Sequence, residues 1–361
     1  MKSLKHLELW FRRQFNRHVG AQRIPIVVGH PQQAIPIGTA PRILVLRQDR
    51  IGDVLVAVPV LRALRECYPA SVIDMVLSPN NIAARSAVAP YIDDVIIHLK
   101  GLRGLLKTRR TLRVNSYDVV IDLMDNASST SALLVSFAHS RYAVGIDKEN
   151  RGVYTHVVPL ADRATVHIVE RISRLLWPLN VDPATHDLHL EYPLTDAERA
   201  EARRTVREPS SKKKIFGINI SGSDVSRMYS EAGIIELIEH CKKHHPDTEA
   251  IVLCAKQHQE MQERIAQATG SKAIAPTPSF HSWAAIVSEL DALFTPDTSS
   301  VHLAAAFQKP SVVLFVHDRI DLMPWYPYLT TCYPVETTSG TIDQIPIAEV
   351  IQAVDRCLGD L

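Results

Sequence analysis

The chain has 361 residues, of which 46% are hydrophobic and 22% charged, so it is long enough to bury the cores of two ordinary domains. Its 40 lysines and arginines balance 39 acidic residues, and a net charge of +1 gives no reason to expect a nucleic-acid partner. The five cysteines are scattered and never spaced as Cys-x-x-Cys, which indicates neither a disulfide framework nor a thiolate metal site and favours a reducing cytosol.

Residues 1–40 differ in pattern from the rest of the chain. Leucines and phenylalanines recur at helical spacing between residues 4 and 15, with lysines and arginines on the other faces, which predicts a basic amphipathic helix. Three prolines between residues 25 and 36 then predict an extended connector, and we expect the folded body to begin near Pro41. Because no apolar run approaches the roughly 20 residues of a membrane span, we expect a soluble or peripheral protein.

From residue 41 to about 190, short apolar runs alternate with amphipathic stretches, as in the βαβ units of a parallel sheet. The predicted strands are 42–47, 71–77, 94–99, 118–123 and 141–146. One predicted helix ends near residue 68, a second lies near residues 80–89, and an amphipathic stretch covers residues 165–177.

A second series of the same kind follows a charged, helix-like segment at 195–208. Its predicted strands are 214–220, 249–255, 292–296 and 311–316, with helices near 231–245, 257–268, 281–289 and 299–307. We therefore expect an α/β protein with two Rossmann-like domains, residues 41–190 and 191–344, whose parallel sheets face a central cleft. A C-terminal helix is expected within 345–361. Ligands of such folds collect at the carboxyl ends of the strands.

The first informative motif joins a strand to an apolar helix through the pair Gly52-Asp53. This places Asp53 at the carboxyl edge of a sheet, where two interpretations are open. An aspartate is favoured at a helix start because it accepts hydrogen bonds from free backbone N–H groups. The same position also suits a general base that acts on a ligand at the sheet edge.

This segment resembles glycosyltransferase family 9, the lipopolysaccharide heptosyltransferases, through Gly52, Asp53, Pro59 and the run Leu-Arg-Ala-Leu at 61–64. The resemblance covers most of residues 41–358 and implies the GT-B fold. It also implies inverting transfer, without a metal ion or other cofactor, of a heptose or related sugar from an ADP-sugar to the lipopolysaccharide inner core. The resemblance makes Asp53 the base that takes the proton of the acceptor hydroxyl.

The second motif is a strand that ends at Asp297 and leads into a helix beginning with hydroxyl residues, similar to the family's Asp-Thr-Gly signature. Thr298 and Ser299 bring hydroxyls and free N–H groups to a helix N-terminus, which suits a diphosphate. By resemblance Asp297 belongs to the same donor site, where it bonds ribose hydroxyls, a cation or the loop backbone. His302, one turn into the helix, is either packed or in contact with the ligand, and Ser299 stands where the family has glycine.

The third motif is a strand that runs into a small polar turn, comparable to the family's loop after the corresponding strand. Ser221, Gly222 and Ser223 offer N–H and O–H donors, and Arg227 falls where relatives place a lysine near the donor phosphates. An arginine keeps the cation and can bind a phosphate through two hydrogen bonds. Taken alone, the segment is equally an ordinary exposed loop.

A run of cations without any acidic residue follows the strand predicted at 94–99. Such a run is usually a solvated helix face, but its place beside the expected acceptor side favours contact with an anionic glycolipid at a membrane surface. Two arginines of the first strand-to-helix loop could add cations at the reaction centre. The acceptor-side residues are Arg47, Arg50, Lys100, Arg103, Lys107, Arg109 and Arg110.

Several motifs are missing, among them a Walker A loop, a Gly-x-Ser-x-Gly elbow, a His-Glu-x-x-His pair and a Gly-x-Gly-x-x-Gly turn. His240, His244 and His245 fall at a predicted helix C-terminus, where imidazoles suit the dipole, so we expect no metal there. The sequence thus predicts a cytoplasmic enzyme at the cytoplasmic face of the inner membrane. Two alternatives remain: a related transferase with a protein acceptor, and a non-catalytic sugar-nucleotide-binding paralogue.

Overall fold

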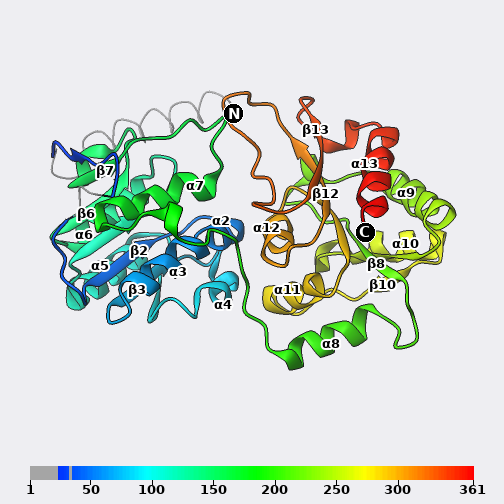
Figure 1. The fold of residues 1–361 in the computed structure, drawn as a ribbon, viewed down its shortest axis with the longest axis horizontal. Coiled ribbons are helices and arrows are strands. Elements are labelled where there is room, and N and C mark those ends of the chain that lie inside the picture. Colours follow the sequence, from blue (N-terminus) through cyan, green and yellow to red (C-terminus); the bar gives the residue numbers. More distant parts are fainter. Residues whose placement is uncertain (1–22, 32–34) are drawn as a thin grey trace. The chain divides into compact units, whose positions relative to one another are not determined.

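The computed structural model describes residues 23–31 and 35–361 and divides them into two compact units (Figure 1). Unit 1 comprises the described residues up to Asp162 together with Ile168–Leu188. Unit 2 comprises Arg163–His167 and His189–Leu361. The amphipathic helix predicted at the start of the chain lies outside the described residues.

Unit 1 is built on a parallel sheet with the strand order β1-β7-β6-β5-β2-β3-β4. The central strands are almost wholly buried because helices cover both faces of the sheet, which explains their continuous apolar runs. The strands are β1 (Ile26–Val27), β2 (Arg42–Leu46), β3 (Val72–Leu77), β4 (Asp94–Ile97), β5 (Val119–Asp122), β6 (Tyr142–Ile146) and β7 (His156–Val158).

The helices of unit 1 pack in two groups. Contacts join α2, α3, α4 and α7 on one side, and α5 and α6 on the other. The one helix predicted to end near residue 68 is divided at Ala57, because Pro59 has no N–H with which to continue the hydrogen-bond ladder. The bounds are α2 (Ile51–Val56), α3 (Val58–Cys67), α4 (Arg85–Val88), α5 (Leu102–Asn115), α6 (Ser129–Ala138) and α7 (Ile168–Ser173).

The folded body begins before Pro41, so the expectation that it starts there was wrong. Ile26 and Val27 form the edge strand β1, which pairs with β7, and both Val28 and Ile35 are buried. A proline-rich segment can still supply an edge strand, because there an absent N–H removes no bond of the sheet interior. Two residues are too short a strand for an apolar pattern to predict.

Unit 2 is a second parallel sheet, with the strand order β10-β9-β8-β11-β12-β13. Its core packs the strands against α9, α10 and α13, while α8, α11 and α12 form a separate group of contacts. The strands are β8 (Lys214–Asn219), β9 (Thr248–Leu253), β10 (Lys272–Ile274), β11 (Ala292–Pro296), β12 (Ser311–Val316) and β13 (Cys332–Thr337). The helices are α8 (Asp196–Val206), α9 (Glu231–His244), α10 (Gln259–Thr269), α11 (Phe280–Ser288), α12 (Ser299–Ala306) and α13 (Ile347–Gly359).

The two parallel α/β units confirm the predicted fold class. Every strand predicted from an apolar run is present, with bounds shifted by a few residues at most. Within the described residues, no helix is long and apolar enough to cross a bilayer.

Candidate active site

The second and third motifs meet at the carboxyl edge of the unit 2 sheet. Strands β8 and β11 are neighbours, and Phe294 pairs with Ile218. The Nδ2 atom of Asn219, at the end of β8, donates to Oγ1 of Thr295 at 2.9 Å. The loops that follow the two strands therefore start side by side, although they are about 75 residues apart in sequence.

Helix α12 begins at this edge, with Thr298 as its N-cap. The Thr298 hydroxyl accepts a hydrogen bond from the backbone N–H of Ser300 at 3.3 Å, and Ser299 is the first helical residue. A helix start of this kind presents free N–H groups and the positive end of a dipole to a ligand. His302 is buried, with its ring centroid 6.1 Å from that of Trp325, so it packs inside unit 2.

Arg227 reaches the same place from the loop after β8. Its Nη1 atom donates to the backbone carbonyl of Asp297 at 3.1 Å and forms an ion pair with the Asp297 carboxylate. Gly222 makes this possible, because a Cβ there would collide with the carbonyl of Arg227. The turn thus folds back on itself and brings Arg227 beside the start of α12.

Ser221 connects this loop to the residues that follow β9. Its Oγ accepts a hydrogen bond from the backbone N–H of Ala255 at 2.8 Å and lies 2.8 Å from Nδ1 of His258. Burial lowers the pKa of His258, which favours its neutral form. The neighbouring Ser223 is exposed and donates to the side chain of Asp224. His258 was not predicted, since a single histidine after a predicted strand is no signal of a functional site.

In unit 1, Asp53 lies at the start of α2 and contacts two arginines. One carboxylate oxygen is 2.8 Å from Nη2 of Arg47, and the other accepts from the backbone N–H of Arg50 at 3.0 Å. Arg47 is almost fully buried and also donates to the carbonyls of Asp53 and Leu123. The expectation that Arg47 is an acceptor-side cation is thereby corrected, because its guanidinium donates its hydrogen bonds to groups inside the protein. Arg50, by contrast, is exposed.

A second carboxylate network lies at the same sheet edge and was not predicted. Asp122, at the end of β5, accepts hydrogen bonds from Ser131 at 2.8 Å and from Tyr154 at 2.5 Å, and it pairs with Lys148 at 3.1 Å. Burial lowers the pKa of Lys148, although the neighbouring Asp122 opposes this shift. The network ties β5, α6 and the residues after β6 together and gives the edge a fixed charge pattern.

Asp49 is the partly buried carboxylate of the loop between β2 and α2. Burial raises its pKa to about 6, and the negative charges of Asp53 and Asp122 add to the effect of burial while Arg47 opposes it. A carboxylate with a pKa in this range can accept and release protons near neutral pH. The sequence offered no means of separating Asp49 from its neighbours.

The predicted cationic residues 100–110 lie on α5 and just before it. Lys100, Arg103, Lys107 and Arg110 are exposed. Arg109 instead lies over the ring of Phe137, 5.6 Å from its centroid, and is partly buried. The structure therefore leaves four of the five predicted residues on the surface.

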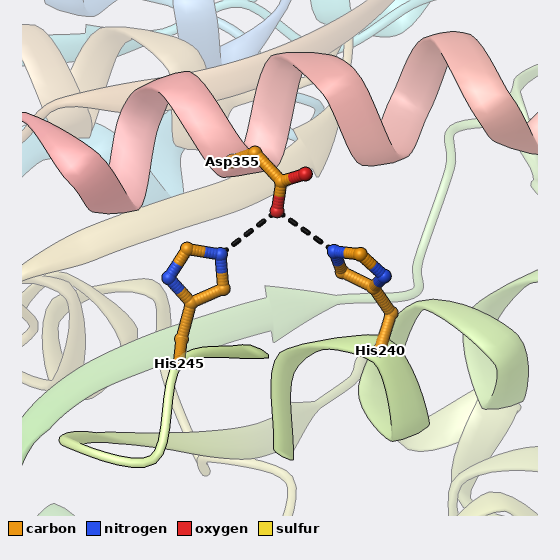
Figure 2. Close-up of side chains that lie close together, drawn as sticks. All are labelled: His240, His245 and Asp355. Carbon is orange, nitrogen blue, oxygen red and sulfur yellow. Dashed lines mark hydrogen bonds and ion pairs between the residues drawn. The ribbon is translucent and has the colours of Figure 1, made fainter. Parts of the chain in front are cut away.

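Two histidines at the end of α9 converge on one carboxylate of α13. Figure 2 shows the rings of His240 and His245 directed at a single oxygen of Asp355, each Nε2 atom 2.8 Å from it. Ligands held 2.0–2.1 Å from a tetrahedral metal ion lie about 3.4 Å apart. Contacts of 2.8 Å therefore indicate two N–H donors sharing an acceptor. Burial acts to raise the pKa of Asp355, but the hydrogen bonds from His245 and His240 outweigh it and lower the pKa.

The fold defines a class of protein: two parallel α/β units with interleaved helices, the GT-B fold of the glycosyltransferases that the chain resembles in structure. Residues 105–339 match the model of glycosyltransferase family 9 (heptosyltransferase), and the chain belongs to this family.

Similar proteins agree with this assignment. The chain is 24% identical over 338 residues to lipopolysaccharide heptosyltransferase 3 of Escherichia coli, covering 85% of this chain and 96% of that protein. Its fold is similar to the family 9 glycosyltransferase of Veillonella parvula, with a TM-score of 0.74 and 19% identity over 91% of this chain and all of that one. It is also similar to E. coli heptosyltransferase WaaC with ADP, with a TM-score of 0.65 and 18% identity over 88% of this chain and 99% of that one.

Proposed function

We propose that this glycosyltransferase moves a heptose or a related sugar from an ADP-sugar to the inner core of lipopolysaccharide. The observation that carries the proposal is the start of α12 beside Arg227, where a guanidinium group and the N-terminus of a helix suit the diphosphate of a nucleotide sugar. The lipopolysaccharide acceptor is supported by the names of the relatives, which are lipopolysaccharide heptosyltransferases.

In the proposed reaction the acceptor oxygen attacks the anomeric carbon, the bond from that carbon to the diphosphate breaks, and the configuration inverts. Negative charge grows on the departing diphosphate and is met by Arg227, Thr298, Ser299 and the N–H groups at the start of α12. These groups supply the stabilisation that a divalent cation gives in other transferases. We therefore propose that transfer requires no metal ion.

We propose that Asp53 takes the proton of the acceptor hydroxyl. Its oxygens are positioned by Arg47 and by the N–H of Arg50, and each keeps a further lone pair. Asp49 is the natural comparison, because it lies in the preceding loop and its pKa of about 6 suits a base. A pH profile of transfer by the Asp53→Asn and Asp49→Asn variants separates the two carboxylates, since only the variant without the base loses the acidic limb of the profile.

The acceptor is proposed to bind at the unit 1 side, with Arg50 and the exposed cations of α5 facing its phosphates or carboxylates. We accordingly propose that the protein works at the cytoplasmic face of the inner membrane.

The decisive experiment is a screen of ADP-, GDP- and UDP-sugars for binding, followed by mass spectrometry of core glycolipid from cells with and without the protein. We expect an ADP-sugar to bind and the core of the deletion strain to lack one sugar. A protein that bound no nucleotide sugar would contradict the proposal. Binding with an unchanged glycolipid would point to a protein acceptor or to a non-catalytic paralogue.

A further inference from the structure

Helix α5 carries large apolar side chains on its solvent side, where a helix of a soluble protein normally has polar ones. Leu102 and Leu106, one helical turn apart, expose 72% and 52% of their surfaces. The buried side of the helix is formed by Gly104, Thr108 and Leu112. The two leucines therefore do not belong to the hydrophobic core.

Two apolar residues at and just after the end of strand β4 are also exposed. Ile97 and Leu99 expose 47% and 46% of their surfaces, whereas His98 between them is buried, as the alternation of a strand requires. His98 lies 3.1 Å from the hydroxyl of Thr108, and a Cβ on Gly104 would collide with the carbonyl of Leu99. The end of the strand is thus held directly against α5 on the side of Ile96 and His98. Leu99 lies beside the start of the helix, whereas Ile97 points to the opposite face of the sheet.

Cations are interleaved with these apolar residues. No acidic residue occurs between Val95 and Tyr117, and four exposed cations lie among the three leucines Leu99, Leu102 and Leu106. We call this the α5 surface; it consists of Leu99, Lys100, Leu102, Arg103, Leu106, Lys107 and Arg110.

We propose that the α5 surface docks on an anionic phospholipid bilayer, with the leucines entering the interface and the cations facing the headgroups. Charge complementarity favours this occupant, because apolar side chains flanked by lysine and arginine suit the boundary between acyl chains and anionic headgroups. A second copy of the chain would bring like charges together at the same face. The purpose of this docking rests on the proposed function, since docking would hold unit 1 at the membrane in which the proposed glycolipid acceptor lies.

The test uses the full chain and vesicles of phosphatidylethanolamine and phosphatidylglycerol, with no sugar donor and no lipopolysaccharide. We expect the double variant Leu102→Gln/Leu106→Gln to bind these vesicles about tenfold more weakly than the wild type, because two apolar anchors are lost. The matched control is Ile320→Gln, which changes an aliphatic residue of unit 2 that is 93% exposed, and it should bind as the wild type does.

The cationic part is tested in the same way. Arg103→Gln/Lys107→Gln should weaken binding about tenfold, whereas the exposed pair Lys212→Gln/Lys213→Gln should leave it unchanged. Vesicles of pure phosphatidylcholine should bind the wild type poorly. Thermal unfolding of each variant verifies that its fold is intact.

Hydrogen exchange of the wild type supplies a measurement that needs no substitution. Peptides covering residues 97–107 should exchange more slowly when anionic vesicles are present. Binding of the leucine variant within twofold of the wild type, or unchanged exchange in these peptides, would overturn the inference. The vesicle assay contains no sugar donor and no acceptor, so it tests the α5 surface alone. Vesicle binding by a protein that binds no nucleotide sugar in the separate screen would keep the α5 surface and reject only the proposed function.

Discussion

Arg227 and Asp297, 70 residues apart in the chain, form an ion pair beside the N-terminus of α12. The same guanidinium also donates to the Asp297 backbone carbonyl. Both side chains are about one quarter exposed, at 27% each, so an incoming anion can reach them. A diphosphate at this helix start would share Arg227 with Asp297, and Asp297 would hold the guanidinium in place while the ligand is absent.

Replacing Arg227 by alanine should cost about 2–4 kcal/mol of transition-state stabilisation and weaken nucleoside diphosphate binding, because the departing phosphate loses its cation. Arg227→Lys should recover part of both effects, since a lysine keeps the charge with a different geometry. Calorimetry of ADP binding and transfer assays measure the two quantities. Unchanged affinity together with unchanged turnover in the alanine variant would reject the phosphate role.

Gly222→Ala should weaken ADP binding by about tenfold, because the new Cβ collides with the Arg227 carbonyl and displaces the turn that carries this arginine. Gly359→Ala is the matched control, since nothing lies near the position of its Cβ. Calorimetry of both variants makes the comparison. Equal ADP affinity in the two would show that the turn does not position Arg227 for the nucleotide.

Asp53→Asn should lower turnover by about 100-fold or more while ADP-sugar affinity changes little, as expected for the loss of a base. It should also reduce the free energy of unfolding by about 1–3 kcal/mol, because the buried Arg47 loses its counter-charge. Turnover must therefore be measured well below the midpoint of unfolding, with donor affinity as the control. Near-normal turnover would remove Asp53 from the base role.

Asp49→Asn should stabilise the protein at pH 8 by about 2 kcal/mol, after allowance for the partial exposure of the side chain. Burial raises the pKa of Asp49 to about 6 in the folded protein, so the carboxyl group is neutral and costs no stability below pH 4. As the pH rises through 6 the group ionises in its buried site, and this part of the stability is lost. The advantage of the asparagine variant should therefore vanish below pH 4. Denaturant unfolding of both proteins between pH 4 and pH 8 measures the difference in their free energies of unfolding. A difference that did not change with pH would contradict the raised pKa of Asp49.

Asp355→Asn should destabilise unit 2 by about 1 kcal/mol at pH 7, because the asparagine carbonyl is a weaker acceptor for His240 and His245 than a carboxylate. Treatment with EDTA should leave the thermal midpoint of the wild type unchanged if these contacts are hydrogen bonds alone. A midpoint that fell with EDTA and rose again with Zn²⁺ would show a metal ion in their place.

Local patterns were sufficient to predict much of the fold. Apolar runs such as 42–46 and 311–316 are strands in the structure because a strand buried on both faces needs little besides apolar residues. The short edge strands β1 and β10 escaped prediction because two or three residues carry no periodicity. The position of Thr298 at a helix start was also readable, since the capping preference is local.

The sequence by itself determined two αβ series and the segments that meet at each sheet edge, because both follow from residue patterns within a few turns of chain. Only the tertiary structure decided which charges face one another. Arg47 looked like a surface cation, yet neighbouring strands enclose it, and Asp122 acquired its partners from residues up to 32 positions away. The pKa of Asp49 and the pairing of Arg227 with Asp297 depend in the same way on burial and on distant neighbours, which no local pattern encodes.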